Sequence, residues 1–432
     1  MDSLVGGLFQ SLPLYNFDSQ TLLYSFAALF IVALIVGISV ILSKRNTMST
    51  PDNIQRITGV QTTEFEKQLT PYFKPKTTLS EQALSANQKV LVNFAPLTVV
   101  QPGYIGPTEN GVYKEEEGVS TALKAGARCF VLPIDYHENS GLPKPAFPNA
   151  GEPCLLYRDE GGTIRSLNSG SIQRIAQALG NLAFNNTVPL NKDPLIVVLY
   201  FLKTPAPNTK EYLRYCSQVA KQLNPLIPVL LGQAPEGVYN RQNRQNEILY
   251  TPITNLERKV ILMCNIDTSI FRNPTSVGVQ TVPSTEDLDF FVHMRLFKQS
   301  DESMGATVRA GQNEFARGYL ERFFYYTTIP ENRTQDTIEI NRIRWIVALP
   351  AVGANPLLKD AKYALEKLGV QCIGLNLFAL NEESLGIVNL WKSTGWVPKP
   401  EAIRFTIPEP YKPKTPSPTL NANQGKVSSP TL

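Results

Sequence analysis

Residues 129–134 read CFVLPI and residues 195–202 read LIVVLYFL, and these two apolar runs decide the expected fold. Nearly every position in each run carries a large or β-branched apolar side chain, so a strand built from either run needs cover on both faces. Strands covered on both faces are typical of a parallel sheet enclosed by helices. The two runs therefore predict an α/β fold around a parallel sheet.

Similar apolar runs recur on both sides of these two. They are VLVNF near Val90, CLLY at Cys154, the Pro225 to Leu231 stretch, KVILMCN at Lys259, FFYYTT at Phe323, WIVALP at Trp345 and CIGLNLF at Cys372. Together with the first two runs they slightly exceed the eight strands of a closed barrel. The assignment of the individual strands therefore stays open.

Helical patterns, with apolar residues three and four positions apart, lie between the runs. They are GVSTALKAGA before Cys129, SGSIQRIAQALGNLAF before Leu195, TKEYLRYCSQVAKQL around Tyr212 and NPLLKDAKYALEKLG before Cys372. Gly126 and Gly369 stand where two of these helices should end. Strand and helix alternate over most of the chain, which favours a closed (β/α)8 barrel of the TIM type. An open sheet gives a similar pattern and remains the alternative.

The composition fits a globular protein and excludes several other classes. The chain has 432 residues, of which 43% are hydrophobic, and these suffice for a sizeable core. The formal net charge is only +4, so we expect no nucleic acid partner. The five cysteines stand far apart without a Cys-x-x-Cys pair, which predicts neither a disulfide framework nor a zinc site.

One segment points to a membrane. Residues 22–42 read LLYSFAALFIVALIVGISVIL, an uncharged run long enough to cross the roughly 30 Å hydrocarbon core as a helix. Asp2 and Asp18 precede it and no Lys or Arg does, which argues against a cleaved signal peptide. We therefore expect a transmembrane helix over residues 22–43, with a buried core helix as the alternative.

The flanking charges predict the orientation of this helix. Lys44 and Arg45 follow the apolar run, so the positive-inside rule places the body on the cytoplasmic side. Asn185 and Asn332 fit the glycosylation pattern, but a cytoplasmic body would never meet the glycosylating enzyme. The expected domains are a non-cytoplasmic stub over 1–21, the helix over 22–43, a polar stalk over 44–85, the barrel over 86–408 and a disordered tail over 409–432.

Six segments of the body match one known pattern in order. They are GARCFVLPIDYHE from Gly126, EPCLLYRDE from Glu152, DPLIVVLYFL from Asp193, NLERKVILMCN from Asn255, GVQCIGLNLFA from Gly369 and STGWVPKPEAIR from Ser393. They resemble the phosphoinositide-specific phospholipases C, in the X and Y halves of their catalytic barrel. Each match is short, and their common order along the chain makes them specific together. The resemblance implies the TIM barrel of the phospholipase-C-like phosphodiesterases.

The residues that the family uses for catalysis are replaced in this chain. The family needs two histidines for acid and base catalysis and carboxylates that hold Ca²⁺. Residues 99–111, where the first histidine is expected, contain none, and Arg158 stands in place of the second. The carboxylate positions fall on Val131, Pro133 and Tyr200, and a phosphate-binding lysine position falls on Met263. We expect these last four residues to lie in a pocket at the carboxyl ends of the strands, with no bound metal and no cofactor.

Two functional hypotheses follow from the resemblance. The first is a membrane-anchored, catalytically inactive pseudoenzyme that serves as a structural or binding module. The alternative is an active phosphoric diester hydrolase or lyase on phosphoinositide-type lipids, with Ca²⁺ as its cofactor and Asp135, His137, Arg158 and Asp159 as rebuilt catalytic residues. In both cases the membrane is a partner through Leu22 to Leu42, and anionic lipid or other membrane proteins are further candidates.

Overall fold

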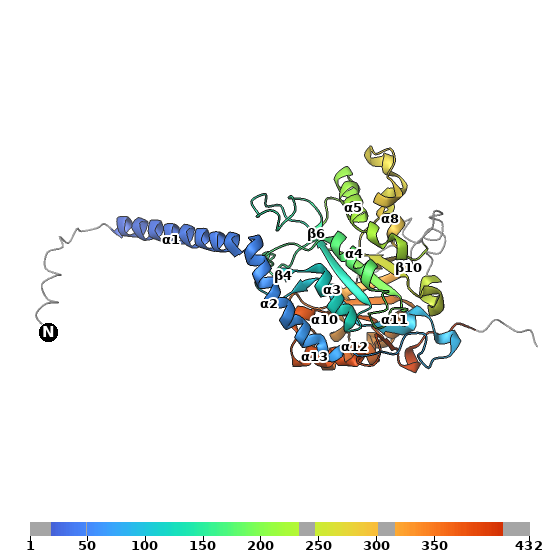
Figure 1. Ribbon diagram of the computed structural model, residues 1–432. Coiled ribbons are helices and arrows are strands. Elements are labelled where there is room, and N and C mark those ends of the chain that lie inside the picture. The colour runs from blue at the N-terminus through green and yellow to red at the C-terminus, as the bar shows by residue number, and fades with distance from the viewer. Residues whose placement is uncertain (1–18, 49, 233–246, 301–315, 409–432) are drawn as a thin grey trace, which may run out of the picture.

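The computed structural model describes residues 19–48, 50–232, 247–300 and 316–408 (Figure 1). Within these residues, eight parallel strands form one closed ring. In order around the ring they are β2 (Thr98–Val100), β5 (Cys129–Asp135), β7 (Leu195–Phe201), β8 (Val260–Cys264), β9 (Met294–Phe297), β10 (Ala316–Arg322), β11 (Trp345–Leu349) and β12 (Cys372–Leu375). The ring closes because β2 pairs with both β5 and β12. This closure confirms the predicted α/β barrel and excludes the open sheet.

All four predicted helices are present on the outside of the ring. They are α3 (Glu115–Lys124), α4 (Ile172–Leu182), α5 (Lys210–Gln222) and α12 (Leu358–Glu366). Gly126 and Gly369 follow α3 and α12 with φ angles of 98° and 70°, a conformation that glycine adopts without strain. The other helices of the body include α7 (Glu247–Tyr250), α8 (Leu288–Phe291), α10 (Phe323–Thr327), α11 (Glu331–Ile343) and α13 (Glu382–Val388).

Three of the predicted strands are wrong. VLVNF forms a 3₁₀ turn over Leu91–Asn93 and then enters β1 (Phe94–Pro96), which pairs with β13 (Trp396–Pro398) outside the ring. The Pro225 to Leu231 stretch is largely a 3₁₀ helix, since Pro225 and Pro228 cannot donate the backbone hydrogen bonds of a sheet. FFYYTT forms α10, which begins where β10 ends.

The predicted CLLY strand lies beside the ring, and three ring strands escaped prediction. CLLY contains β6 (Cys154–Leu155), which pairs antiparallel with β5. Strand β2 has only three residues, too few to show a recognisable apolar run in the sequence. Strands β9 and β10 carry charged residues that break their apolar runs.

The core has two layers. Alternate strand residues such as Val131, Val198 and Met263 point inward and fill the ring. The residues between them, such as Leu132 and Leu199, pack against the surrounding helices. The inner layer also contains Trp345 and Trp396, and it is a packed interior rather than a pore.

The predicted stalk contains a helix that packs on the barrel. Helix α2 (Pro51–Leu69) buries Phe65 and Leu69 in the outer core layer. Its amino-terminal half meets the hairpin of β3 (Tyr104–Ile105) and β4 (Val112–Tyr113). Phe65 and Leu69 are its only fully buried large apolar side chains, so the sequence pattern of α2 is weak.

Helix α1 (Ser19–Met48) precedes α2 and projects from the body (Figure 1). Its side chains are described for Tyr24 and for residues 26–40, and the large apolar ones among them are exposed. No helix within the described residues is both long enough and apolar enough for a membrane crossing. The transmembrane helix over residues 22–43 stays a prediction. Residues 1–18 of the stub and the tail over 409–432 lie outside the described residues.

Candidate functional site

A cavity of about 320 Å³ opens at the carboxyl ends of the ring strands, and we call it the mouth cavity. Parallel barrels place their functional residues at this end, because loops from all eight strands meet there. The polar residues that line the mouth cavity are Gln101, Tyr157, Tyr200, Lys298, Ser300, Glu321, Arg322 and Asn376. They come from strands or loops that are far apart in the sequence.

Gln101 stands directly after β2 and is held from several sides. Its backbone φ is 56°, in the left-handed region that non-glycine residues rarely adopt. The Tyr113 hydroxyl donates to Gln101 Oε1 over 2.5 Å, and Gln101 Nε2 donates to the carbonyl oxygen of Leu156 over 3.3 Å. Strained backbone of this kind clusters at functional sites. In the sequence, Gln101 is simply a glutamine before a Pro-Gly pair, and nothing there marks it as a site residue.

Two cations stand at the rim of the mouth cavity. Lys298 and Arg322 are exposed, and neither has a hydrogen bond or an ion pair within the described residues. Glu321 is buried beside them, and its Oε1 accepts from both the backbone N–H and the hydroxyl of Ser300, over 2.9 and 2.7 Å. The cations are therefore available to an anionic ligand, whereas this carboxylate already has partners.

Tyrosines form one wall of the mouth cavity. Tyr157 stacks on Tyr104 with ring centroids 4.8 Å apart, and Phe378 meets its edge. Burial raises the pKa of Tyr157 above its ordinary value. Burial also raises the pKa of Tyr200, and the charges of Arg322 and Glu321 act on it in opposite directions. Both phenols are therefore protonated at neutral pH and can donate hydrogen bonds.

The four predicted pocket residues lie at two depths. Pro133 and Tyr200 line the mouth cavity. Val131 and Met263 are fully buried in the ring interior beneath it. None of the four offers a carboxylate or an amine. In the part of the chain that the structure describes, no group of three or more His, Cys, Asp or Glu residues is arranged to hold a metal ion.

Two of the four candidate catalytic residues form an ion pair with each other. Arg158 Nε lies 2.6 Å from Asp135 Oδ2, and Asp135 is almost fully buried. The same guanidinium donates to the carbonyl oxygens of Tyr136 and Gly162. The backbone N–H of Tyr136 donates to the other oxygen of Asp135. These contacts fix the loops after β5 and β6, and neither residue lines the mouth cavity.

The other two candidates have different partners. His137 is buried, with Nδ1 3.0 Å from the carbonyl oxygen of Asn139 and Nε2 2.9 Å from that of Pro148. Asp159 pairs with Arg165 over 2.7 Å and accepts from the backbone of Thr163. None of the four candidate residues lines the mouth cavity.

The second histidine of the chain has a structural position. His293 is buried, and its Nδ1 accepts from the backbone N–H of Leu262 over 3.0 Å. Its Nε2 lies 2.8 Å from the carbonyl oxygen of Leu231 and donates to it. His293 does not line the mouth cavity, so neither histidine of the chain reaches it.

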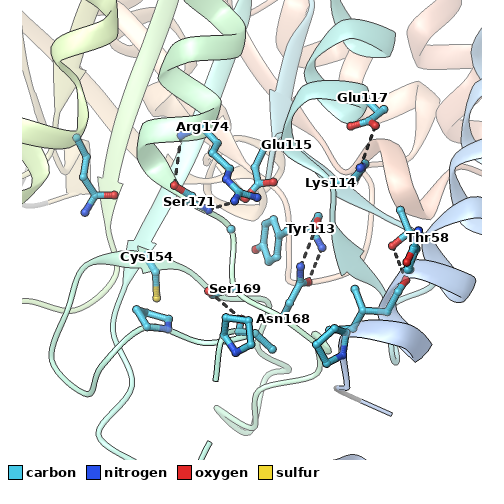
Figure 2. Close-up of a pocket in the computed structure, with 18 of the residues that line it drawn as sticks. Thr58, Tyr113, Lys114, Glu115, Glu117, Cys154, Asn168, Ser169, Ser171 and Arg174 are labelled. Atoms are coloured by element: carbon cyan, nitrogen blue, oxygen red, sulfur yellow. Dashed lines mark hydrogen bonds and ion pairs between the residues drawn. The ribbon is translucent and has the colours of Figure 1, made fainter. Parts of the chain in front are cut away.

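A larger cleft of about 1200 Å³ lies beside the mouth cavity (Figure 2). It is bounded by α2, by the starts of α3 and α4 and by the loop over 145–154. Its charges are mixed and largely paired, as with Lys114 and Glu117, which are 3.1 Å apart. Tyr113 lines this cleft and bonds Gln101 in the mouth cavity, so the two hollows are neighbours.

The mouth cavity combines positive charge with hydrogen-bonding groups. Lys298 and Arg322 supply positive charge, and tyrosine and amide groups supply hydrogen bonds. Among the described residues, the lining also contains the Glu321 carboxylate and no imidazole.

Comparison with known proteins supports the fold. No protein-family model and no curated protein matches this chain. The crystal structures of PLC21 from L. pealei and from S. officinalis resemble it, with TM-scores of 0.52 and 0.51 and 13% identity in each case. Each match covers 76% of this chain and 39% of the other, so the chain spans well under half the length of these proteins. The barrel therefore has the phospholipase-C-like TIM-barrel fold.

Proposed function

We propose that this phospholipase-C-like barrel is a non-catalytic binding module that α1 anchors in a membrane. The observation that carries the proposal is the mouth cavity, where Lys298 and Arg322 face an opening with no imidazole in its lining. Such a cavity fits a phosphate-bearing group, such as an anionic lipid headgroup, and lacks the two imidazoles that the resembled family uses for acid and base catalysis.

The anchor rests on separate observations. The run over 22–42 is uncharged, and Phe26, Leu29 and Phe30 of α1 are each about two-thirds exposed. Exposed apolar side chains along one helix are costly in water and favourable in a lipid interior. With Lys44 and Arg45 after the run, the body lies on the cytoplasmic side.

Ligand binding is tested on the full chain in nanodiscs. We expect inositol 1,4,5-trisphosphate to bind saturably in a calorimetric titration, and uncharged myo-inositol not to bind. Lys298→Ala and Arg322→Ala should each weaken binding about tenfold, because each removes a charge-assisted contact. Lys362→Ala, at an exposed position on α12, is the matched control and should leave the affinity unchanged. Equal affinity in all four proteins would refute binding at the mouth.

Turnover tests the alternative function. Without the family's two imidazoles at the mouth, phosphatidylinositol and its phosphorylated forms should stay uncleaved with or without Ca²⁺. The active alternative makes the opposite prediction. Cleavage by the wild type that His137→Ala or Arg158→Ala abolishes would show rebuilt chemistry around these residues and would overturn the non-catalytic proposal.

A further inference from the structure

A cavity of about 430 Å³ lies outside the ring, and we call it the side cavity. It is bounded by Gln299 in the loop after β9, by the end of α10 and by one face of α11. Among the described residues, it shares no lining residue with the mouth cavity. Its volume lies in the range of small-molecule sites. The side cavity is therefore a separate place where a ligand could bind.

Gln299 supplies a buried hydrogen-bond donor to the side cavity. Its side chain belongs to a residue that is only 3% exposed, and its Oε1 accepts from the hydroxyl of Tyr326 over 3.0 Å. Burial raises the pKa of Tyr326 well above its ordinary value, so this hydroxyl stays protonated and donates. The amide nitrogen of Gln299 has no hydrogen-bond partner within the described residues. Because a buried donor without a partner is costly, the position points to an acceptor on a ligand.

Two further donors line the same cavity. The guanidinium of Arg333 and the hydroxyl of Tyr325 have no hydrogen bond or ion pair within the part of the chain that the structure describes. Burial raises the pKa of Tyr325 above its ordinary value, so the phenol is protonated at neutral pH. One positive charge beside two neutral donors is suited to a carboxylate.

Asp336 adds a negative charge close to these donors. It stands three residues after Arg333 on α11, so their Cβ atoms are roughly 5 to 6 Å apart. In the described structure Asp336 has no hydrogen bond or ion pair of its own, with Arg333 or with any other residue. The half-buried Ile329 and Ile340 give the cavity an apolar wall. Two opposite, unpaired charges one helical turn apart match a ligand whose own opposite charges are close together.

We propose that the side cavity binds a free α-amino acid with an aliphatic side chain. The carboxylate accepts from Arg333 and Gln299, the ammonium group donates to Asp336, and the aliphatic chain packs on Ile329 and Ile340. An ion of either sign would leave one charge of the cavity without a partner, whereas a zwitterion serves both. This site goes beyond the proposed function, because it takes a different ligand from the mouth cavity.

Calorimetric titration of the full chain in nanodiscs with L-leucine tests the site. Two probes each lack one charge of leucine: 4-methylpentanoate has no ammonium group, and 3-methylbutylamine has no carboxylate. We expect leucine to bind saturably and each of these probes to bind at least about tenfold more weakly. Glycine keeps both charges without the aliphatic chain and should also bind more weakly than leucine.

Variants on α11 connect the two charges to the two probes. Arg333→Ala and Asp336→Asn change exposed positions, so both proteins should keep the melting temperature of the wild type. Each should bind leucine about tenfold more weakly. Asp336→Asn should no longer distinguish leucine from 4-methylpentanoate, and Arg333→Ala should no longer distinguish leucine from 3-methylbutylamine. Glu331→Gln removes a carboxylate of α11 that does not line the cavity, and it should keep the wild-type affinity.

Three results would overturn the proposal. The first is the absence of saturable binding of leucine up to its solubility limit. The second is equal affinity of the wild type for leucine and 4-methylpentanoate, which would show a plain anion site. The third is equal affinity for leucine in all variants, which would place the amino acid elsewhere on the protein. None of these results bears on the titration with inositol trisphosphate, which probes the mouth cavity.

Discussion

Asp193 is a carboxyl that the fold buries at some energetic cost. Its Oδ1 accepts from the backbone N–H of Leu79 over 3.0 Å, and the buried Arg128 lies near enough to attract it. Arg128 itself donates to the carbonyl oxygens of Ala183 and Pro189. Burial outweighs these favourable contacts and raises the pKa of Asp193 to about 6. The charged form of Asp193 therefore destabilises the folded state at neutral pH.

This raised pKa predicts an unusual dependence of stability on pH. The contribution of Asp193 is fully present below about pH 4 and is lost as the pH rises through about 6. Asp193→Asn keeps an acceptor for Leu79 without the charge. We expect the variant to gain about 3 kcal/mol of unfolding free energy at pH 7.5 and the gain to vanish near pH 4. Urea unfolding at several pH values measures the difference, and a difference that does not change with pH would contradict the prediction.

Asp159→Asn is the control for this experiment, because its pKa shift has the opposite direction. The backbone N–H of Thr163 and the side chain of Arg165 lower the pKa of Asp159. Its stabilising contribution is therefore present at neutral pH and is lost in acid. Asp159→Asn should be less stable than the wild type at pH 7.5, with the deficit closing as the pH falls.

Only some residues of the candidate site can be predicted from the sequence. The resemblance placed Pro133 and Tyr200 at the mouth, and both line it. Gln101 could not be found in this way, because a backbone φ leaves no spacing signal. Asp135 and Arg158 are catalytic candidates only under the active alternative. In the structure they form an ion pair with each other over 2.6 Å, a contact between two loops that the sequence alone does not predict.

Helix α2 is the element that ties the amino-terminal region to the barrel. Its inward face places Phe65 and Leu69 in the outer core, with Thr58 also buried. The rest of the helix is largely polar, and Val60 is 72% exposed. The attachment therefore depends on a few side chains.

Leu69→Ala tests this attachment. Removing a fully buried leucine side chain typically costs about 2 to 4 kcal/mol, through lost transfer energy and the cavity left behind. We expect that loss in urea unfolding, together with faster amide hydrogen exchange in α2. Val60→Ala removes apolar atoms from the exposed face and should change neither quantity. Normal exchange in α2 of the Leu69→Ala variant would show that other contacts hold the helix.

Among the elements, the sequence predicts a strand best where that strand is long and buried on both sides. The strands β5 and β7 have seven residues each and were found as continuous apolar runs. Strand β10 is equally long, but Arg317 and Glu321 interrupt its pattern, and the aromatic run that follows it forms a helix. Closure of the ring, rather than local pattern, makes a strand of this segment.

The body of the molecule is predicted to lie on one side of a membrane. Asn185 and Asn332 are both exposed, so the body presents two accessible glycosylation sequences. We expect neither to carry a glycan when the chain is made with microsomes, because a cytoplasmic body does not meet the enzyme. Protease added to sealed, right-side-out vesicles should also spare residues 86–408. A glycan on either asparagine, or digestion of the body, would reverse the orientation.

The pairing of β2 with β12, which closes the ring, can form only late in synthesis. Strand β2 is the first ring strand in the sequence and β12 the last, and they pair through Thr98 with Gly374 and Val99 with Leu375. At ordinary translation rates, the ribosome needs on the order of tens of seconds to go from one to the other. During that time β2 and the newest strand each present an unpaired edge, which readily joins another chain. The nascent protein should therefore depend on chaperones until β12 has emerged.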